Sequence, residues 1–293
     1  MEGLFAGLST VDIQFMMNEF PEVNTKSVVR ESNIYSGGPA TNAAITYSNL
    51  GGRAALITSV GNHFFTEFIN NDLATYNVKL YDVSLNANTS PIISSIITSR
   101  NTGSRTIVTV DPETNTGITG NNDKYLKDFC KRELKYYKIV LLDCFYIERA
   151  IVIAREAKKL SIPVVIDGGS WKNGMEKLLD FIDVAVCSEK FYPPGVKSTD
   201  EVFEYMSSGS CERIAITRGE KPILYKDRKE YNKISVTRIN AVDTLGAGDV
   251  FHGAFCFYFL KGNNFTEALK NAASVATESC KHIGTRKWAS KVK

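Results

Sequence analysis

Three small residues stand between two aspartates in the stretch NAVDTLGAGDVFHGAF, residues 240–255, directly before an almost wholly apolar segment. A glycine-rich turn that opens a helix directs several backbone N–H groups and the positive end of the helix dipole to one point, which makes an anion site. Asp249 falls in the first turn of that helix, where its carboxylate would repel a bound phosphate unless a proton or a metal ion stood between them. A carboxylate at this place is best explained as a base for a hydroxyl group that attacks phosphorus.

Alternative functions fit this stretch less completely. Gly246 and Gly248 begin a dinucleotide-binding fingerprint, but Phe251 occupies the place of its third glycine and the motif comes late in the chain. No GxxxxGK(S/T) sequence occurs, which excludes a P-loop. Asp249 and His252 lie three residues apart on one helix face and could ligate a metal ion, although the nearby sequence offers no clear third ligand. A simple helix cap would explain the glycines but neither aspartate.

Buried strands and amphipathic helices alternate along most of the chain. The alternation predicts a mostly parallel sheet that helices cover on both faces. Apolar runs with the length of parallel strands occupy residues 4–8, 54–61, 137–145, 162–169, 183–189 and 213–219. Helical patterns occupy residues 41–52, 65–78, 148–161, 199–209, 250–260 and 265–284.

Two segments break this alternation. Residues 15–37 and 90–113 alternate apolar and polar side chains around turn signals, and the second contains the hairpin-like RNTGSR. Antiparallel strands at these places predict a small sheet, inserted as residues 14–33 and about 90–110. The sheet is either a lid over a cleft or a decoration of the main sheet edge.

Composition limits the classes of function. The 293 residues are 43% hydrophobic and 23% charged, and the formal charge of +3 is too mild to indicate nucleic-acid binding. The basic end, KHIGTRKWASKVK, is expected to form a solvated final helix. Six cysteines without a CxxC pair argue against a zinc cluster or a thioredoxin-type redox site. No stretch approaches the ~20 apolar residues of a membrane span, so we expect a cytoplasmic protein that binds neither membranes nor nucleic acid.

Two motifs resemble the signatures of the ribokinase-like (PfkB) carbohydrate kinases. DTLGAGD is similar to the C-terminal signature of that family, and SGGPATNAAITYSNLG, residues 36–51, is similar to the N-terminal one, in the family's order and spacing. The resemblance implies a ribokinase-like three-layer α/β/α sandwich with a small β-sheet lid, formed by residues 1–293 as a single domain. It also implies that Gly246, Ala247 and Gly248 form the anion hole for the transferred phosphoryl group, and that Asp249 is the catalytic base.

The resemblance also assigns a substrate side. Family members hold sugar hydroxyls with an aspartate after the first strand and a Gly-Gly-Asn set, and the matching residues here are Asp12, Gly37, Gly38 and Asn42. Carboxylate and amide groups suit a polyol because they accept and donate hydrogen bonds at fixed angles, while glycine allows the backbone to approach closely. Arg105, in GSRTIV, is similar to a lid residue of ketohexokinases. We expect it to contact substrate or phosphate, unless it only protects an edge strand from aggregation.

The nucleotide side departs from the family pattern. The NxxE motif that organises magnesium and phosphate in many members reads SEKF here, and TxGxxG reads TRGEKP, with Pro222 in place of the second glycine. ATP and Mg²⁺ are still implied, the resemblance leaves room for a monovalent cation, and no metal ligand is assigned. His252 stands where the family often has asparagine and is expected to affect helix packing rather than chemistry. The residues expected on the nucleotide side are Ser188, Glu189, Thr217, Gly219, Thr244 and Cys280.

The resulting hypothesis is an ATP-dependent kinase for a primary hydroxyl of a small sugar. Similarity to ketohexokinase- and sulfofructose kinase-type members narrows that sugar to a ketose, and we expect a homodimer formed through the lid. A nucleoside kinase of the same fold stays open, with Phe15, Met16, Met17 and Phe20 as candidates for a base slot. Two further alternatives are a nucleotide-sensing protein without catalysis and a metal-dependent hydrolase that uses Asp249 and His252.

Overall fold

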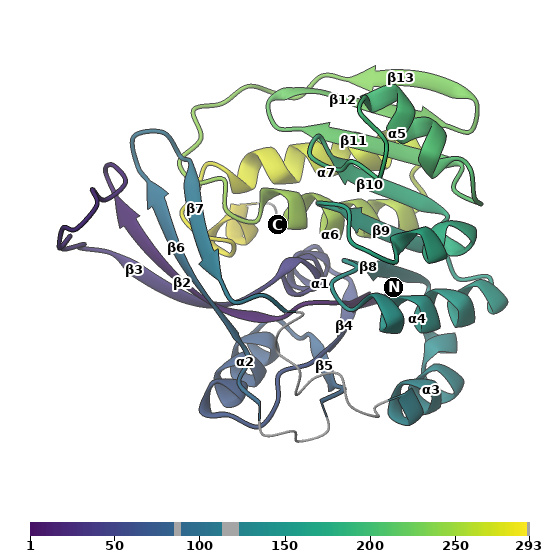
Figure 1. Ribbon diagram of the computed structural model, residues 1–293, viewed down its shortest axis with the longest axis horizontal. Helices are drawn as coiled ribbons and strands as arrows, with labels where there is room; N and C mark the ends of the chain where they lie inside the picture. The colour runs from purple at the N-terminus through teal and green to yellow at the C-terminus, as the bar shows by residue number, and fades with distance from the viewer. Residues whose placement is uncertain (85–88, 113–122, 292–293) are drawn as a thin grey trace.

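A computed structural model describes residues 1–84, 89–112 and 123–291 (Figure 1). Its main sheet has the strand order β13-β12-β11-β10-β9-β8-β1-β4-β5 within those residues. Neighbouring strands are parallel from β5 to β11, and β12 and β13 continue the sheet in antiparallel pairing. The strands are β1 (Glu2–Ala6), β4 (Arg53–Thr58), β5 (Lys79–Asp82), β8 (Ile139–Leu142), β9 (Val164–Gly168), β10 (Val184–Ser188), β11 (Arg213–Arg218), β12 (Lys221–Asp227) and β13 (Glu230–Ile234).

Helices cover both faces of this sheet and make the structure three layers thick. The side chains of each strand alternate between two buried clusters: Phe5 of β1 joins one and Leu4 joins the other. The first cluster includes side chains of α1 (Pro39–Asn49), α2 (Phe64–Thr75), α6 (Ala247–Leu260) and α7 (Phe265–Ser279). The second includes α3 (Asp123–Arg132), α4 (Ile147–Lys159) and α5 (Thr199–Met206). Short 3₁₀ helices are η2 (Leu134–Tyr136), η3 (Met175–Phe181) and η4 (Lys287–Lys291).

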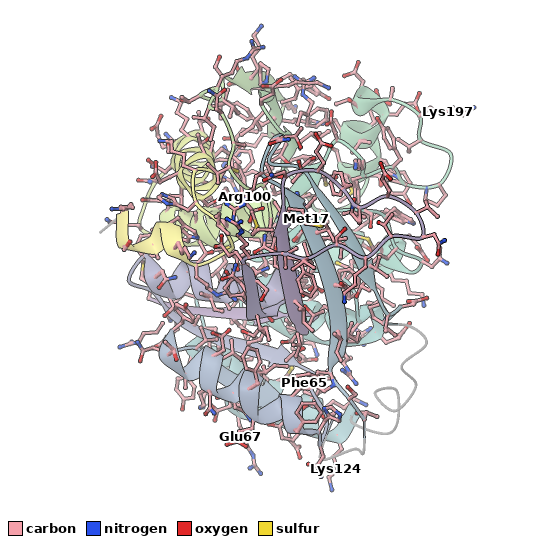
Figure 2. The ribbon with its side chains drawn as sticks, turned by 90° about the vertical axis from the view of Figure 1, so that its left-hand side faces the viewer. Met17, Phe65, Glu67, Arg100, Lys124 and Lys197 are labelled. Carbon is pink, nitrogen blue, oxygen red and sulfur yellow. The ribbon has the colours of Figure 1, made fainter. Side chains whose placement is uncertain are left out.

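A second, smaller sheet projects from the main body, on the left in Figure 1. We call this sheet the lid; its strand order is β3 (Ser32–Gly37), β2 (Thr10–Met17), β6 (Ile92–Ser99) and β7 (Arg105–Thr109). In Figure 2, which faces the lid, the labelled Met17 and Arg100 lie together, and the Arg100 N–H donates to the Met17 carbonyl at 2.7 Å. The Gln14 side-chain amide fixes the lid to the main body by donating to Asp243 at 2.6 Å.

The predicted fold class is confirmed, and each predicted strand and helix of the alternation is present. The pattern missed α3, β5, β12 and β13. The lid strand β2 begins at Thr10, directly after the first strand of the main sheet, and therefore earlier than predicted.

The prediction for the basic C-terminal segment was wrong. Arg286 and Trp288 are 8% and 1% exposed, so this segment packs into the body instead of forming a solvated helix. The Arg286 guanidinium bonds inside the molecule, and Trp288 belongs to the core beneath α6 and α7. Charge alone did not show which of the basic residues point outward.

Candidate active site

The site lies where the carboxyl ends of the parallel strands, the N-terminus of α6 and the lid meet. A cavity of about 560 Å³ there is lined by residues of β2, β6 and β7 from the lid and by the ends of β9, β10 and β11 from the main sheet. A second cavity of about 570 Å³ adjoins it on the side of α7 and β12. Both cavities are bordered by Arg105, Glu189, Lys190, Thr217, Gly219, Gly248 and His252. The shared residues mark the passage between the two spaces.

The glycine-rich turn opens α6 at this passage. Gly246 is the N-cap, with φ of 68°, and a Cβ there would lie 2.6 Å from Thr285 Cγ2, so a glycine is required. No side chain caps the helix, and the N–H groups of Gly248 and Asp249 have no acceptor within it. At Gly248 a Cβ would meet no described atom within 4 Å. The turn therefore directs free donors into open space, as an anion site needs.

Asp249 is half-buried beside these donors. Its Oδ2 accepts a hydrogen bond of 2.7 Å from the Asn42 amide of α1, a residue far away in the chain. Burial is the largest cause that raises the pKa of Asp249 to about 7, and the neighbouring Asp167 carboxylate raises it further. A carboxyl group with this pKa can accept a proton near neutral pH, which suits a general base.

Arg286 fixes the orientation of the Asn42 amide, a role that no motif in the sequence indicated. Its Nη1 donates to Asn42 Oδ1 at 2.8 Å, so the amide must present its NH₂ group to Asp249. Nη2 also donates to the Ser36 carbonyl, at the start of the Gly37-Gly38 turn. One buried guanidinium thus connects the N-terminal motif with the Asp249 carboxylate.

The predicted substrate residues line the first cavity, with one exception. Asp12 lies on β2, accepts a hydrogen bond of 2.6 Å from Thr10 Oγ1, and has its pKa raised by burial. Gly38 and Asn42 also line this cavity, whereas Gly37 does not. Gly37 instead supports Asp12 from behind, because a Cβ on Gly37 would lie 1.9 Å from the Asp12 carboxylate.

Arg105 joins the lid to the loop before the turn. Its Nη1 donates to the carbonyl oxygen of Thr244 at 2.9 Å and to Thr244 Oγ1 at 3.0 Å. No carboxylate of the described residues lies within ion-pair distance of its guanidinium, so the charge stays available to a ligand. Ala247, Thr244 and Cys280 line the second cavity only.

Several residues of the first cavity were not predicted from the sequence, among them Asp143, Phe145, Asp167 and Lys172. Asp143 follows β8 and accepts hydrogen bonds from the backbone N–H groups of Leu8, Ala40 and Phe145, and burial raises its pKa to about 6. Lys172 lies beside the Phe145 ring, with its Nζ 4.2 Å from the ring centroid. Asp143 and Asp167 each stand at the carboxyl end of a predicted parallel strand, and that position was the available signal.

The metal-dependent hydrolase hypothesis finds no support in the geometry. No group of three or more His, Cys, Asp or Glu that could hold a metal ion occurs in residues 1–84, 89–112 and 123–291. Both ring nitrogens of His252 lie against backbone carbonyl oxygens and are not free to coordinate. In the same ranges no helix is both long enough and apolar enough to cross a bilayer.

Comparison with known proteins agrees with this geometry. The family description "pfkB family carbohydrate kinase" matches residues 4–291. Mouse ketohexokinase is 23% identical in an alignment 290 residues long, which covers 94% of this chain and 95% of that protein. A putative ribokinase from Agrobacterium tumefaciens superposes with a TM-score of 0.84 at 23% identity, covering 98% of this chain and 94% of that one. Adenosine kinase from Sinorhizobium meliloti superposes with a TM-score of 0.74 at 18% identity, covering 99% of this chain and 98% of that one. The chain therefore belongs to the pfkB family of carbohydrate kinases and is a phosphotransferase.

Proposed function

We propose that this protein transfers the γ-phosphoryl group of ATP to a primary hydroxyl of a small sugar, a ketose. The observation that carries the proposal is the juxtaposition at the start of α6. Asp249, with a pKa near 7, lies directly beside the free N–H groups of the glycine-rich turn, at the passage between two cavities. A base and an anion hole on one helix turn are the two parts that hydroxyl phosphorylation requires.

The first cavity is assigned to the acceptor sugar. Asp12 and Asn42 would hold its hydroxyls, and the reacting hydroxyl would lie against Asp249. As that oxygen attacks phosphorus, Asp249 takes its proton, while the turn's N–H groups stabilise the charge on the phosphoryl oxygens. Arg286 keeps Asn42, and through it the base, in position without lining the cavity itself.

The second cavity is assigned to ATP. Its wall has an apolar part suited to a purine ring, formed by Ile223, Val236, Ile239, Phe251, Ala273 and Ala276. The polyphosphate would run toward the passage, where Thr217 and Gly219 lie with Arg105 and Lys190. The positive charges of Arg105 and Lys190 would attract the negatively charged phosphates of the nucleotide.

The residues at the passage fit a phosphate-bound magnesium ion. Mg²⁺ needs only one or two protein carboxylates, because phosphate oxygens and water fill its other positions. Glu189 lines the passage with a half-exposed carboxylate that pairs with Lys221 at 3.2 Å, and it is the residue that would hold the ion. Ser188 is less suited, since its hydroxyl donates to the Gly169 carbonyl at 2.7 Å. When bound, Mg²⁺ would neutralise phosphate charge. A monovalent cation stays a prediction from the family resemblance.

The acceptor cavity favours a sugar over a nucleoside. Phe15, Met16, Met17 and Phe20, the candidates for a base slot, line neither cavity. The apolar contributions from the lid to the acceptor cavity are Ile96 and Ile107. The main body adds the polar side chains of Asn42, Asp143, Asp167 and Lys172 beside the apolar Leu8, Pro39, Phe145 and Leu245.

An ATP turnover assay with a substrate panel tests the proposed activity. The panel contains fructose, tagatose, ribose, sulfofructose and adenosine, and the expected result is ADP formation that is fastest with a ketose. If turnover is fastest with adenosine, the ketose proposal is wrong and the protein is a nucleoside kinase. ATP binding without turnover on any acceptor would favour the nucleotide-sensing alternative.

The lid offers a surface for dimerisation. Its outer face exposes Ile34 (52%) and Val108 (69%), and Val110 (53%) is exposed just after β7; apolar side chains of this size are normally kept from water. We propose that two copies pair through this face, that residues 1–293 act as a single kinase domain with its lid, and that the enzyme works in the cytoplasm.

A further inference from the structure

His252 lies on α6 one turn after Asp249, is 5% exposed, and borders both cavities. Its Nδ1 is 2.7 Å from the Gly248 carbonyl oxygen, and its Nε2 is 3.0 Å from the carbonyl oxygen of Val186 in β10. A backbone carbonyl oxygen can only accept a hydrogen bond. A neutral imidazole has one N–H group, so one of these two contacts would bring two lone pairs together.

A counter-charge is present on the same side of the ring. Asp167 Oδ2, at the end of β9, lies 3.5 Å from His252 Nδ1, and Asp167 is 6% exposed. A buried cation is tolerated when it is both paired and hydrogen-bonded, and His252 satisfies both conditions. We propose that His252 is a fixed imidazolium, and that it acts as a positioning residue that tunes both the catalytic carboxylate and the anion hole from behind.

The first route of action is a peptide bond. The Gly248 carbonyl and the Asp249 N–H belong to the same peptide group, and that N–H is one of the free donors at the start of α6. A cationic donor on the carbonyl polarises the peptide and strengthens its N–H as a donor. The charge of His252 therefore reaches a phosphoryl group in the anion hole without contacting it.

The second route is the ionisation of Asp249. Burial and the Asp167 carboxylate raise the pKa of Asp249, whereas His252 and Arg105 favour its charged form. Asp143, directly after β8, is a further carboxylate close to Asp167. The charge on His252 therefore acts against the Asp167 carboxylate, which favours the protonated form of Asp249.

The remaining elements around α6 contribute fewer charges. Helix α1 presents the Asn42 amide, and Cys280 at the end of α7 stays a thiol because burial raises its pKa. The other charged side chains along the wall of the first cavity are Asp12, Lys172, Glu189 and Lys190. Two of these are acidic and two are basic, so their charges oppose one another.

Nuclear magnetic resonance tests the charge directly, and this test does not depend on the proposed function. The chain has three histidines, so spectra of ¹⁵N-histidine-labelled enzyme can be assigned with His63→Gln and His282→Gln variants. At pH 7.5 a free imidazole is mostly neutral. We expect His252 to show two protonated ring nitrogens at that pH. A neutral tautomer in the wild-type enzyme would overturn the proposal.

Kinetics test the consequence, which rests on the proposed function. His252→Asn keeps an N–H donor near the Nδ1 position but removes the charge, so the acidic limb of kcat/KM should move to higher pH by about one unit. Asp167→Asn removes the opposing carboxylate and should move the limb to lower pH. His282→Asn is the matched control, because His282 also pairs with a carboxylate, Glu278 at 3.0 Å, but lines neither cavity. It should leave the profile unchanged.

The outcomes separate charge from packing. Opposite shifts in the two variants support a tuning charge, since a purely structural role would lower activity without moving the limb. An acidic limb of kcat/KM that stays at the wild-type pH in both variants, or that shifts in the same direction in both, would contradict the proposal. His252→Gln, which offers its donor near the Nε2 position, repeats the test if His252→Asn fails to fold. Absence of kinase activity in the wild-type enzyme would contradict the proposed function. The nuclear magnetic resonance spectra would still test whether His252 is charged.

Discussion

The Asp249 carboxyl group combines three features that a general base needs: partial burial, a hydrogen bond from Asn42, and free backbone donors beside it. Its pKa is raised to about 7, so the folded enzyme holds a proton there below that pH. A protonated carboxyl cannot accept the proton of the attacking hydroxyl. We therefore expect kcat/KM to fall about tenfold per pH unit below pH 7 and to level off above it. A profile that stays flat from pH 5 to 8 would contradict this role.

Individual residues show how far prediction from the sequence could go. The turn residues Gly246 to Asp249 could be found because glycines and a carboxylate seldom occur together at a helix start without an anion to bind. Asp143 and Asp167 could not be separated from ordinary residues after a strand. Lys172 and Arg286 were less visible still, since a basic residue is more often solvated than buried. The contacts of Asp143 and Arg286 reach residues more than one hundred positions away, which only folding reveals.

Among the elements, the N-terminus of α6 carries the clearest prediction. Because a side chain at Gly248 would point into open space, Gly248→Val should fold with an unchanged melting temperature. The added branched side chain would keep phosphate from the N–H groups, and loss of such a donor costs on the order of 3 kcal/mol, or about 10² in kcat. Gly248→Ala is the control, with a smaller loss expected. Normal turnover by folded Gly248→Val would show that this turn does not touch the phosphoryl group.

The junction between α1 and the C-terminal segment carries a second prediction. Arg286→Met removes the donors to Asn42 and to the Ser36 carbonyl, and each orphaned buried group costs about 1–3 kcal/mol. We expect a clearly lower melting temperature and a lower kcat. The control is Arg228→Met, whose surface pair with Glu212 is worth little. Equal melting curves for both variants would contradict the role of Arg286 as a link between the two motifs.

The elements themselves were predictable to different degrees. Parallel strands such as β8 to β11 have an apolar run at their centre because both faces are buried there, and this makes them visible in the sequence. Strand β13, with the sequence EYNKI, lies at the sheet edge and has four exposed residues of five. It therefore has no apolar run by which it could be predicted from the sequence. Helix α3 was not predicted because its many charged residues obscure the helical pattern of apolar residues in the sequence.

For the whole molecule, the lid is predicted to close the acceptor cavity and to form the dimer contact. Val108→Glu places a charge on the exposed outer strand β7 and should convert a dimer into a monomer in sedimentation or light-scattering measurements. Leu160→Glu is the control, since Leu160 is also exposed but follows α4, away from the lid. A dimer that persists in Val108→Glu, or a wild-type monomer, would contradict pairing through this face.

The central claim is that Asp249 removes a proton from a sugar hydroxyl while the α6 turn holds the phosphoryl group. The direct measurement is steady-state ATP turnover of Asp249→Asn with the best ketose of the panel, together with the affinity of the variant for ATP. Asparagine keeps the size of the side chain and cannot act as the base, so kcat should fall by about 10²–10⁴ while ATP affinity stays nearly constant. Wild-type turnover by Asp249→Asn would contradict the account.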